Sequence, residues 1–225
     1  MNSEIDEPSA RGRVVVVFGS TGTAGNGAVH ACLADPGVAE VRAVTRRPLG
    51  SSHPALVEVM CSDFADLSPI ARHLRGVDTC LFCLGSSARK VSGEAQYREI
   101  HVTYALAAAR SLKEESPGAS FVYLSGAGTH RDSRMMWARV KAEAEDRLAE
   151  LGLTHHVNVR PGFILPVAPT GLSRWLLKPL LGLAPPLGIR AEDLGRAMLR
   201  AGLDHSLGAE SITLANRELR ELAGP

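Results

Sequence analysis

The stretch Arg13-Val-Val-Val-Val-Phe18-Gly19-Ser-Thr-Gly22-Thr-Ala-Gly25-Asn-Gly27 carries the clearest structural pattern in the chain. Its first part is an apolar run of strand length, which is typical of a central parallel strand buried on both faces. Glycines then recur at positions 19, 22 and 25, and the segment 24–34 is apolar enough to form a helix that packs on a sheet. The stretch therefore predicts a strand, a tight turn and a helix, which together begin a β-α-β unit.

The rest of the chain continues this alternation of strands and helices. Strands are predicted at 38–44, 56–61, 77–84, 119–124 and 154–159, and helices at 67–74, 93–115 and 134–151. This order predicts an α/β fold with a single doubly wound parallel sheet of the Rossmann type.

Three regions are predicted along the chain. Residues 1–12 are polar and predict a disordered tail, and residues 13–165 form the Rossmann domain. Residues 166–225 predict a small, loop-rich C-terminal cap integrated with the same domain. Within the cap we expect helices around 172–181, 191–201 and 217–222, and an edge strand at 211–214.

Composition excludes several classes of protein. The chain has 225 residues with 25 Lys plus Arg against 24 Asp plus Glu, so its net charge of +1 argues against a nucleic-acid binder. No apolar run approaches the ~20 residues of a membrane span, and no basic start leads into a secretory signal. These absences predict a cytoplasmic protein with no membrane partner.

The four cysteines, Cys32, Cys61, Cys80 and Cys83, follow no disulfide or zinc spacing, so no metal site is predicted. Cys80 and Cys83 form a CxxC pair inside an apolar stretch. Redox pairs of this kind lie at an exposed helix start, so buried strand cysteines are the favoured interpretation.

The glycine turn carries the first functional prediction. Glycines at this spacing, after a strand and before a helix, let the backbone approach a pyrophosphate that lies at the positive end of the helix. The predicted dinucleotide contacts are Gly19, Ser20, Thr21, Gly22, Thr23, Ala24 and Gly25. The alternative, a plain strand-to-helix turn, needs only one glycine.

The turn G-S-T-G-T-A-G resembles that of extended and atypical short-chain dehydrogenases/reductases. Later segments agree in order, namely Thr45-Arg46-Arg47-Pro48, Ser62-Asp63-Phe64, Cys83-Leu84-Gly85 and Arg160-Pro161-Gly162-Phe163. Together they resemble the atypical branch with the NmrA-like regulators and the Tat-interacting oxidoreductase-like proteins. The resemblance covers about residues 13–165 and implies a nicotinamide dinucleotide cofactor.

The end of the second strand indicates which dinucleotide is bound. An acidic residue there accepts a hydrogen bond from the ribose 2′-hydroxyl of NAD, whereas arginine accommodates the 2′-phosphate of NADP. The chain has Arg46 and Arg47 with no carboxylate nearby, so NADP(H) is predicted and NAD(H) is less expected. Two solvated arginines are the alternative.

The resemblance implies further cofactor contacts. Asp63 would accept a hydrogen bond from the adenine amino group, with Phe64 beside the ring; a helix N-cap ahead of Leu67 is the alternative role for Asp63. Leu84 and Gly85 end the fourth strand, where ligands bind in open sheets. The segment 161–163, Pro161, Gly162 and Phe163, would pass beside the nicotinamide carboxamide.

The catalytic pattern is incomplete. The resemblance implies a Tyr-x-x-x-Lys pair on the helix after the fifth strand, whose spacing places both side chains on one helix face. Lys141 fits, and it would also hold the nicotinamide ribose, but Trp137 stands at the tyrosine position. Indole donates a hydrogen bond and cannot act as a general acid or base. Ser125 matches one serine usually found there, while Ala127 stands two residues later.

Histidines are the candidate substitutes for the missing tyrosine. His101 stands where extended relatives often have Asn and titrates in the useful range, and His130 follows the fifth strand. A lone histidine is more often a packing residue, and His155 and His156 are interpreted as structural. The candidate catalytic residues are therefore Lys141, Ser125 and His101.

Two hypotheses for the function follow. The first is an NADP(H)-binding oxidoreductase that acts on a small carbonyl or alcohol substrate. The alternative is a catalytically silent dinucleotide sensor that binds a regulatory protein partner. A methyltransferase is disfavoured, because such sites usually place an acidic residue after the second strand.

Overall fold

A computed structural model describes residues 12–166, 188–207 and 211–224. The predicted tail, apart from Gly12, and the helix predicted around 172–181 lie outside the described residues. Everything below concerns the described part of the chain.

One parallel sheet organises the molecule. Its strand order is β3-β2-β1-β4-β5-β6-β9, and every neighbouring pair is parallel. The strands are β1 (Arg13–Phe18), β2 (Val38–Thr45), β3 (Leu56–Met60), β4 (Thr79–Phe82), β5 (Ser120–Leu124), β6 (His155–Arg160) and β9 (Ile212–Ala215). The strand order reverses between β1 and β4, so the predicted doubly wound fold is confirmed. Ligands of such sheets bind at this reversal, beyond the carboxyl ends of the strands.

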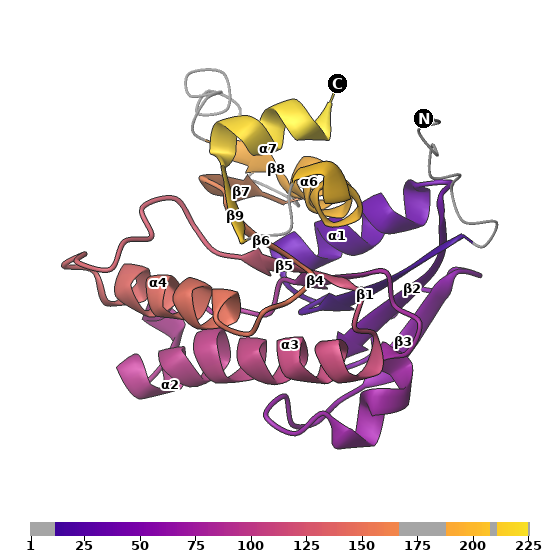
Figure 1. The fold of residues 1–225 in the computed structure, drawn as a ribbon, viewed down its shortest axis with the longest axis horizontal. Helices are drawn as coiled ribbons and strands as arrows, with labels where there is room; N and C mark the ends of the chain where they lie inside the picture. The colour runs from indigo at the N-terminus through magenta and orange to yellow at the C-terminus, as the bar shows by residue number, and fades with distance from the viewer. Residues whose placement is uncertain (1–11, 167–187, 208–210, 225) are drawn as a thin grey trace, which may run out of the picture.

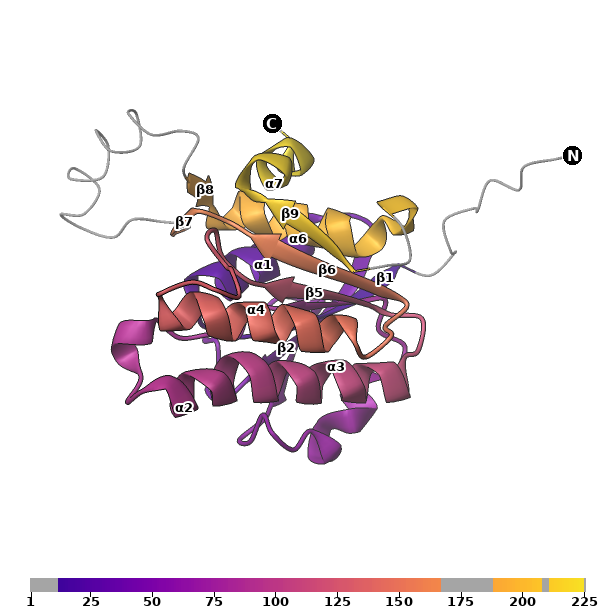
Figure 2. The same ribbon diagram turned by 60° about the vertical axis from the view of Figure 1, so that its left-hand side comes forward.

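Helices cover both faces of the sheet (Figure 1). One face carries α1 (Thr23–Ala34) and α6 (Ala191–Leu203), with α7 (Asn216–Ala223) packed on α6. The opposite face carries α3 (Tyr104–Glu115) and α4 (Met136–Ala149) (Figure 2). The short helical segments are η1 (Ser68–Leu74), η2 (Ala88–Lys90), α2 (Glu94–Arg98), η3 (Glu99–Thr103) and η5 (His205–Leu207).

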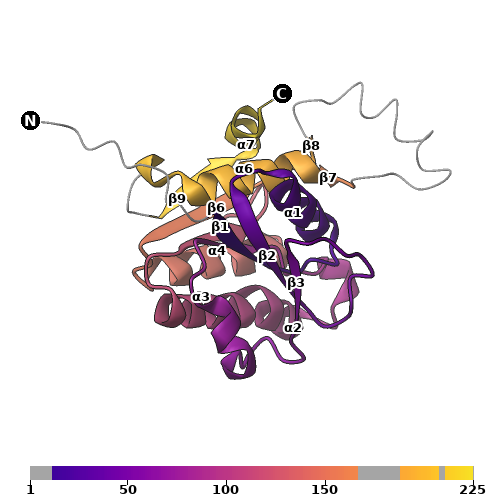
Figure 3. The same ribbon diagram turned by 90° about the vertical axis from the view of Figure 1, so that its right-hand side faces the viewer.

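The sheet lies between two layers of helices (Figure 3), and alternation along β1 gives each layer apolar side chains to pack against. Val15 and Val17 belong to the core cluster under α1 and α6, whereas Val16 and Phe18 belong to the cluster on the α3 side. All four side chains are at most 1% exposed. A strand apolar on both faces must be central, and the sequence of β1 therefore places the glycine turn at the middle of the sheet.

The chain after residue 187 returns to the sheet. Helix α6 packs closely on α1 at two glycines. A Cβ atom at Gly195 would lie 2.6 Å from the carbonyl oxygen of Gly27, so the two backbones can approach this closely only because residue 195 has no side chain. Strand β9 then pairs with β6. The described part of the predicted cap therefore contributes strand β9 to the sheet and helix α6 to the helical layer on one of its faces. A second, small parallel sheet joins β7 (Phe163–Leu165) to β8 (Gly188–Arg190), which the sequence did not predict.

The long helix predicted at 93–115 forms, but its winding changes within it. Segments α2, η3 and α3 follow one another without a break, and η3 is a π-helical turn. Such turns are rare and occur frequently at functional sites. His101 lies within this one.

Candidate functional site

Close backbone approach explains two of the glycines between β1 and α1. Gly19 has a φ of +82°, and a Cβ atom there would lie 2.6 Å from the backbone nitrogen of Leu84. A Cβ atom at Gly25 would collide with the carbonyl of Gly19. The turn therefore folds back on itself and also touches the loop after β4.

The positive end of α1 is open at this turn. Gly22 is the N-cap, no side chain among the described residues caps the helix, and its first turn has no acidic residue. Gly22 itself is exposed, and a Cβ atom there would approach only the carbonyl oxygen of Gly19, at 3.4 Å. Uncapped N-terminal amides with no competing carboxylate fit an anionic group such as a pyrophosphate.

The hydroxyl residues of the turn divide into two kinds. Ser20 is buried, and its Oγ donates to the carbonyl oxygen of Val17 at 3.2 Å, so it stabilises the turn. Thr21 and Thr23 are exposed, whereas Ala24 is buried under the helix. Only the two threonine hydroxyls are accessible to a ligand.

The arginines after β2 are both exposed. The hydroxyl of Thr45 donates to the carbonyl oxygen of Arg47 at 2.7 Å, which shapes the turn. The guanidinium carbon of Arg46 lies 6.0 Å from the ring centre of Phe64, a cation–π arrangement. Within the described ranges, neither guanidinium has an ion-pair partner. Both charges are therefore available to an anion.

The turn after β3 corrects one sequence interpretation. Oδ1 of Asp63 accepts from the amide of Ala65 at 2.8 Å, while Oδ1 of Asp66 accepts from the amide of Ser68, the first residue of η1, at 3.0 Å. The alternative role of Asp63 as a helix N-cap is therefore wrong, because Asp66 is the carboxylate at the start of η1. Asp63 remains exposed.

Phe64 is a core residue. It is 4% exposed, and its ring lies 6.3 Å from that of Phe18 and 5.8 Å from that of Tyr104. This packing role was not assigned from the sequence. Contact with an adenine ring stays a prediction, and it would involve only the small accessible part of Phe64.

The loop after β4 contains Leu84 and Gly85. A Cβ atom at Gly85 would lie 2.9 Å from Cε1 of His101, so the glycine makes room for the imidazole. Leu84 lies against Gly19 through its backbone. The loops after β1 and β4 therefore touch at the point where the strand order reverses.

His101 is buried and its ring is engaged. Its Nε2 lies 3.2 Å from the amide nitrogen of Ser86 and 3.1 Å from the carbonyl oxygen of Ser86. Burial, together with the charge of Lys141, lowers the pKa of His101 to about 3. A neutral imidazole with this partner is poorly suited to general acid catalysis near neutral pH.

Lys141 is fixed at the end of β5. Its Nζ donates to the carbonyl oxygens of Leu124 at 2.9 Å and Ser125 at 3.1 Å. Burial lowers the pKa of Lys141 to about 8, opposed by the negative charge of Glu145. The Oγ of Ser125 lies 3.0 Å from Oγ1 of Thr129, and both hydroxyls are buried.

A partly buried ion pair lies next to this lysine along α4. Glu145, one helical turn after Lys141, forms a bidentate pair with Arg160 at the end of β6, with 3.0 Å between Nε of Arg160 and Oε1 of Glu145. Glu145 is 6% exposed. Glu145 was not predicted from the sequence, although its spacing of four from Lys141 places both residues on one helix face.

Trp137 covers the loop after β5. Cβ atoms at Gly126 and Gly128 would each lie 3.6 Å from its ring, and its Nε1 donates to Sδ of Met135 at 3.3 Å. The indole N–H is therefore satisfied within the protein. His130 is exposed.

The segment after β6 joins neighbouring loops. The amide of Ala127 donates to the carbonyl oxygen of Pro161 at 2.8 Å, and the amide of Gly162 donates to Oδ1 of Asn216 at 2.9 Å. Phe163 is 75% exposed. The loops after β5 and β6 thus meet beside Lys141 and Trp137.

Cys80, Cys83, His155 and His156 have packing roles. Cys80 and Cys83 are buried on opposite faces of the sheet, and burial raises the pKa of Cys83 to about 12. His155 and His156 are buried and bonded to Ala201 and Ser211. In the described ranges, no group of three or more acidic, histidine or cysteine side chains could hold a metal.

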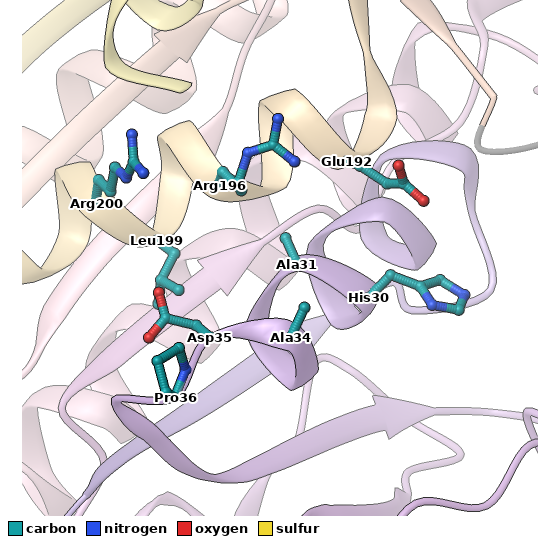
Figure 4. Close-up of a pocket in the computed structure, with 9 residues that line it drawn as sticks. All are labelled: His30, Ala31, Ala34, Asp35, Pro36, Glu192, Arg196, Leu199 and Arg200. Carbon is teal, nitrogen blue, oxygen red and sulfur yellow. The ribbon is translucent and has the colours of Figure 1, made fainter. Parts of the chain in front are cut away.

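A pocket of about 380 Å³ lies elsewhere, between α1 and α6 (Figure 4). Its charged lining includes Asp35, Arg196 and Arg200. Arg196 already pairs with Asp193, and Arg200 donates to the carbonyl oxygen of Leu222. The pocket includes the end of α1, whereas the predicted dinucleotide site lies at its beginning.

No known protein-family profile matches the chain. A protein named fmp52-1, mitochondrial, from Aspergillus terreus is 26% identical over 217 residues, which covers 88% of this chain and 93% of that protein. A protein named FMP52, mitochondrial, from Candida albicans is 25% identical over 225 residues and covers 92% of this chain and 96% of that protein.

Solved structures share the fold. An oxidoreductase of the short-chain dehydrogenase/reductase family from Burkholderia thailandensis has a TM-score of 0.73 at 16% identity, with 93% of each chain covered. The Bordetella bronchiseptica enzyme WbmH, in complex with NAD+, has a TM-score of 0.66 at 17% identity and covers 90% of this chain and 75% of its own. The predicted resemblance to short-chain dehydrogenases/reductases is confirmed in the fold.

The relatives correct one prediction. Their names place them in mitochondria, so the prediction of a cytoplasmic protein is wrong. The prediction was based on the absence of a secretory leader and of a membrane span, and neither absence bears on mitochondrial location. No helix within the described ranges is both long and apolar enough to cross a membrane.

Proposed function

We propose that the chain is an NADP(H)-binding oxidoreductase of the short-chain dehydrogenase/reductase type, acting on a small carbonyl or alcohol. The observation that carries the proposal is the glycine turn. It lies where the strand order reverses, and it leads into a helix whose first turn has no acidic residue and whose positive end is capped by no side chain of the described ranges. The solved complex of WbmH with NAD+ supports a nicotinamide dinucleotide on this fold.

The preference for NADP(H) rests on charge. Arg46 and Arg47 are exposed after β2, and within the described residues neither has an ion-pair partner. A 2′-phosphate would gain a charge-assisted hydrogen bond there, which gives a roughly 10- to 150-fold preference over NAD(H). Asp63 has one carboxylate oxygen without a described partner, which supports its predicted role beside the adenine.

On the catalytic side, Lys141 would bind the nicotinamide ribose with the donor that its two carbonyl partners leave free. The bound cofactor supplies hydride transfer. Ser125 would orient the substrate oxygen, because its hydroxyl can rotate away from Thr129. The proton for that oxygen has no donor at position 137, so we expect slow turnover on ordinary carbonyls.

The alternative is a catalytically silent dinucleotide sensor that binds a protein partner. Trp137 favours it, because an indole N–H does not titrate in the useful range and cannot pass a proton to a substrate. Here the N–H also donates to Sδ of Met135. The sensor would keep the same glycine turn and the same arginines. The two functions therefore differ only in whether bound cofactor is turned over.

Calorimetric titration with NADPH and NADH tests the binding step, and consumption of saturating NADPH with aldehydes and ketones tests turnover. We expect tighter binding of NADPH. Measurable turnover supports the oxidoreductase, whereas binding without turnover supports the sensor. Equal affinities for the two cofactors would refute the NADP(H) preference.

A further inference from the structure

We propose that His101 is a positioning residue for the nicotinamide half of the dinucleotide, holding the loop after β4 against the π-helical turn η3. The proposal rests on the proposed function and adds a role for a residue outside the expected Tyr-x-x-x-Lys pattern. It also replaces the catalytic role predicted for His101.

Contacts on one side of the imidazole fix the loop. Nε2 lies within hydrogen-bonding distance of both backbone groups of Ser86, at 3.2 Å from the nitrogen and 3.1 Å from the oxygen. Cε1 lies 2.9 Å from the place of a Cβ atom at Gly85. The loop can reach the ring this closely only because residue 85 has no side chain.

Contacts on the other side fix the imidazole. The ring centre lies 4.1 Å from that of Tyr97, and the carbonyl oxygen of His101 accepts from the hydroxyl of Tyr123 at 3.1 Å. Tyr123 belongs to β5, at the middle of the sheet. The histidine is therefore anchored to both the helix and the sheet, and the loop is anchored to the histidine.

The loop transmits this position to the dinucleotide site. Leu84, next to Gly85, lies against Gly19 of the glycine turn. Ligands of open sheets bind beyond the carboxyl ends of the strands flanking the reversal, here β1 and β4. The backbone of residues 84–86 therefore lines the path of a bound dinucleotide beyond its pyrophosphate, and His101 sets where that backbone lies.

The identity of the bonded ring nitrogen distinguishes a positioning role for His101 from a role in packing alone. The partner of Ser86 is Nε2, the ring nitrogen farther from the backbone, whereas Nδ1 is buried without a hydrogen-bond partner among the described residues. A glutamine amide reaches about as far as Nε2, and an asparagine amide only as far as Nδ1. His101→Gln should therefore keep the contact, and His101→Asn should lose it.

The experiment measures the affinity of the wild-type protein, His101→Gln and His101→Asn for two ligands by calorimetry. NADPH contains the nicotinamide half, whereas adenosine 2′,5′-bisphosphate contains the adenosine with its 2′-phosphate and no nicotinamide. We expect His101→Asn to weaken NADPH binding about two- to tenfold, the loss of one hydrogen bond, with bisphosphate binding unchanged. His101→Gln should bind both ligands like the wild type.

Wild-type affinity of His101→Asn for NADPH would overturn the proposal, as would an equal loss for both ligands. If His101→Asn does not fold, Gly85→Ala replaces it, with Gly118→Ala as its control because a Cβ atom there meets nothing within 4 Å. Equal NADPH affinities of those two variants would overturn the proposal. A wild-type protein that binds neither ligand would instead refute the proposed function itself, and the role of His101 with it.

Discussion

The two ends of the predicted dinucleotide site differ in how they are built. At the glycine turn, backbone groups and an open helix end provide the chemistry, and glycines make the geometry possible. At the end of β5, individual side chains provide it, and Trp137 has removed one of them. Binding and proton transfer can therefore be lost separately, because binding depends on the backbone of the glycine turn and proton transfer depends on a side chain at the end of β5.

The largest effect is expected at the glycine end. Gly22→Val should abolish dinucleotide binding, because the added side chain would occupy the approach to the amides of α1. The protein should remain folded, since a Cβ atom at Gly22 meets only an oxygen at 3.4 Å. Calorimetric titration with NADPH measures the change, and Gly118→Val is the matched control. Retained affinity in Gly22→Val would mean that the site lies elsewhere.

Acid pH should lower the free energy of unfolding, because His101 and His156 are buried. Burial lowers the pKa of His101 to about 3 and that of His156 to about 4. The pKa of histidine in the unfolded chain is near 6.5. Between that pH and the folded-state pKa values the unfolded chain binds more protons than the folded protein, so the free energy of unfolding is highest above pH 6.5 and falls as the pH drops below it. His156 alone would account for about 3 kcal/mol by pH 4.

Urea unfolding of the wild type and of His156→Gln between pH 7.5 and 4 tests this. The variant should lose less stability over that range than the wild type does. Parallel curves for the two proteins would contradict the assignment to His156.

The ion pair beside Lys141 gives the next effect. Glu145→Gln leaves the charge of Arg160 without its partner and should cost about 2–3 kcal/mol, less than a fully buried pair because Arg160 is partly exposed. Glu143→Gln, on the same helix but with the exposed partner Arg98, should cost less than about 1 kcal/mol. Denaturant unfolding compares them, and similar losses would show that burial does not distinguish the two pairs.

Arg46 and Arg47 should determine the preference for NADP(H) over NAD(H) without contributing to the affinity for NAD(H). Replacing Arg46 and Arg47 with alanine should remove the roughly 10- to 150-fold preference for NADP(H) and leave NAD(H) affinity nearly unchanged. The ratio of the two calorimetric affinities measures this. An unchanged ratio in the double variant would show that neither guanidinium holds the 2′-phosphate.

At the side-chain end we expect an effect on turnover and none on cofactor binding. Trp137→Tyr should raise turnover of aldehydes and ketones, because a phenol would again lie on the same helix face as Lys141. The gain should be only part of the ~10²–10⁴-fold acid–base contribution, since Ala127 supplies no second hydroxyl. Steady-state rates measure it at saturating NADPH. Brisk turnover by the wild type would refute the sensor alternative.

The sequence predicted the sheet well because β1 is apolar on both faces and each strand is followed by a helix or turn signal. It predicted the glycine turn because close backbone approach allows few residues there. The helical segment at 191–201 was found, but its packing on α1 was not, since that depends on Gly27 and Gly195 meeting across the fold.

Side-chain partners were harder to predict than elements. The pair of Glu145 and Arg160, and the contact of His101 with Ser86, join residues 15 positions apart in the sequence. Neither has a local periodic signal, and both become visible only when strand ends and helices are placed together. The N-cap alternative was considered for Asp63 and not for Asp66, although both carboxylates precede the same helical turn.

A crystal structure of the protein soaked with NADP+ would show where the dinucleotide binds. We expect the pyrophosphate on the first turn of α1, the 2′-phosphate at Arg46 or Arg47, and the nicotinamide beside Lys141 with the ring of Trp137 nearby. Cofactor bound away from the turn between Gly19 and Gly25, or none at saturating concentration, would contradict this expectation.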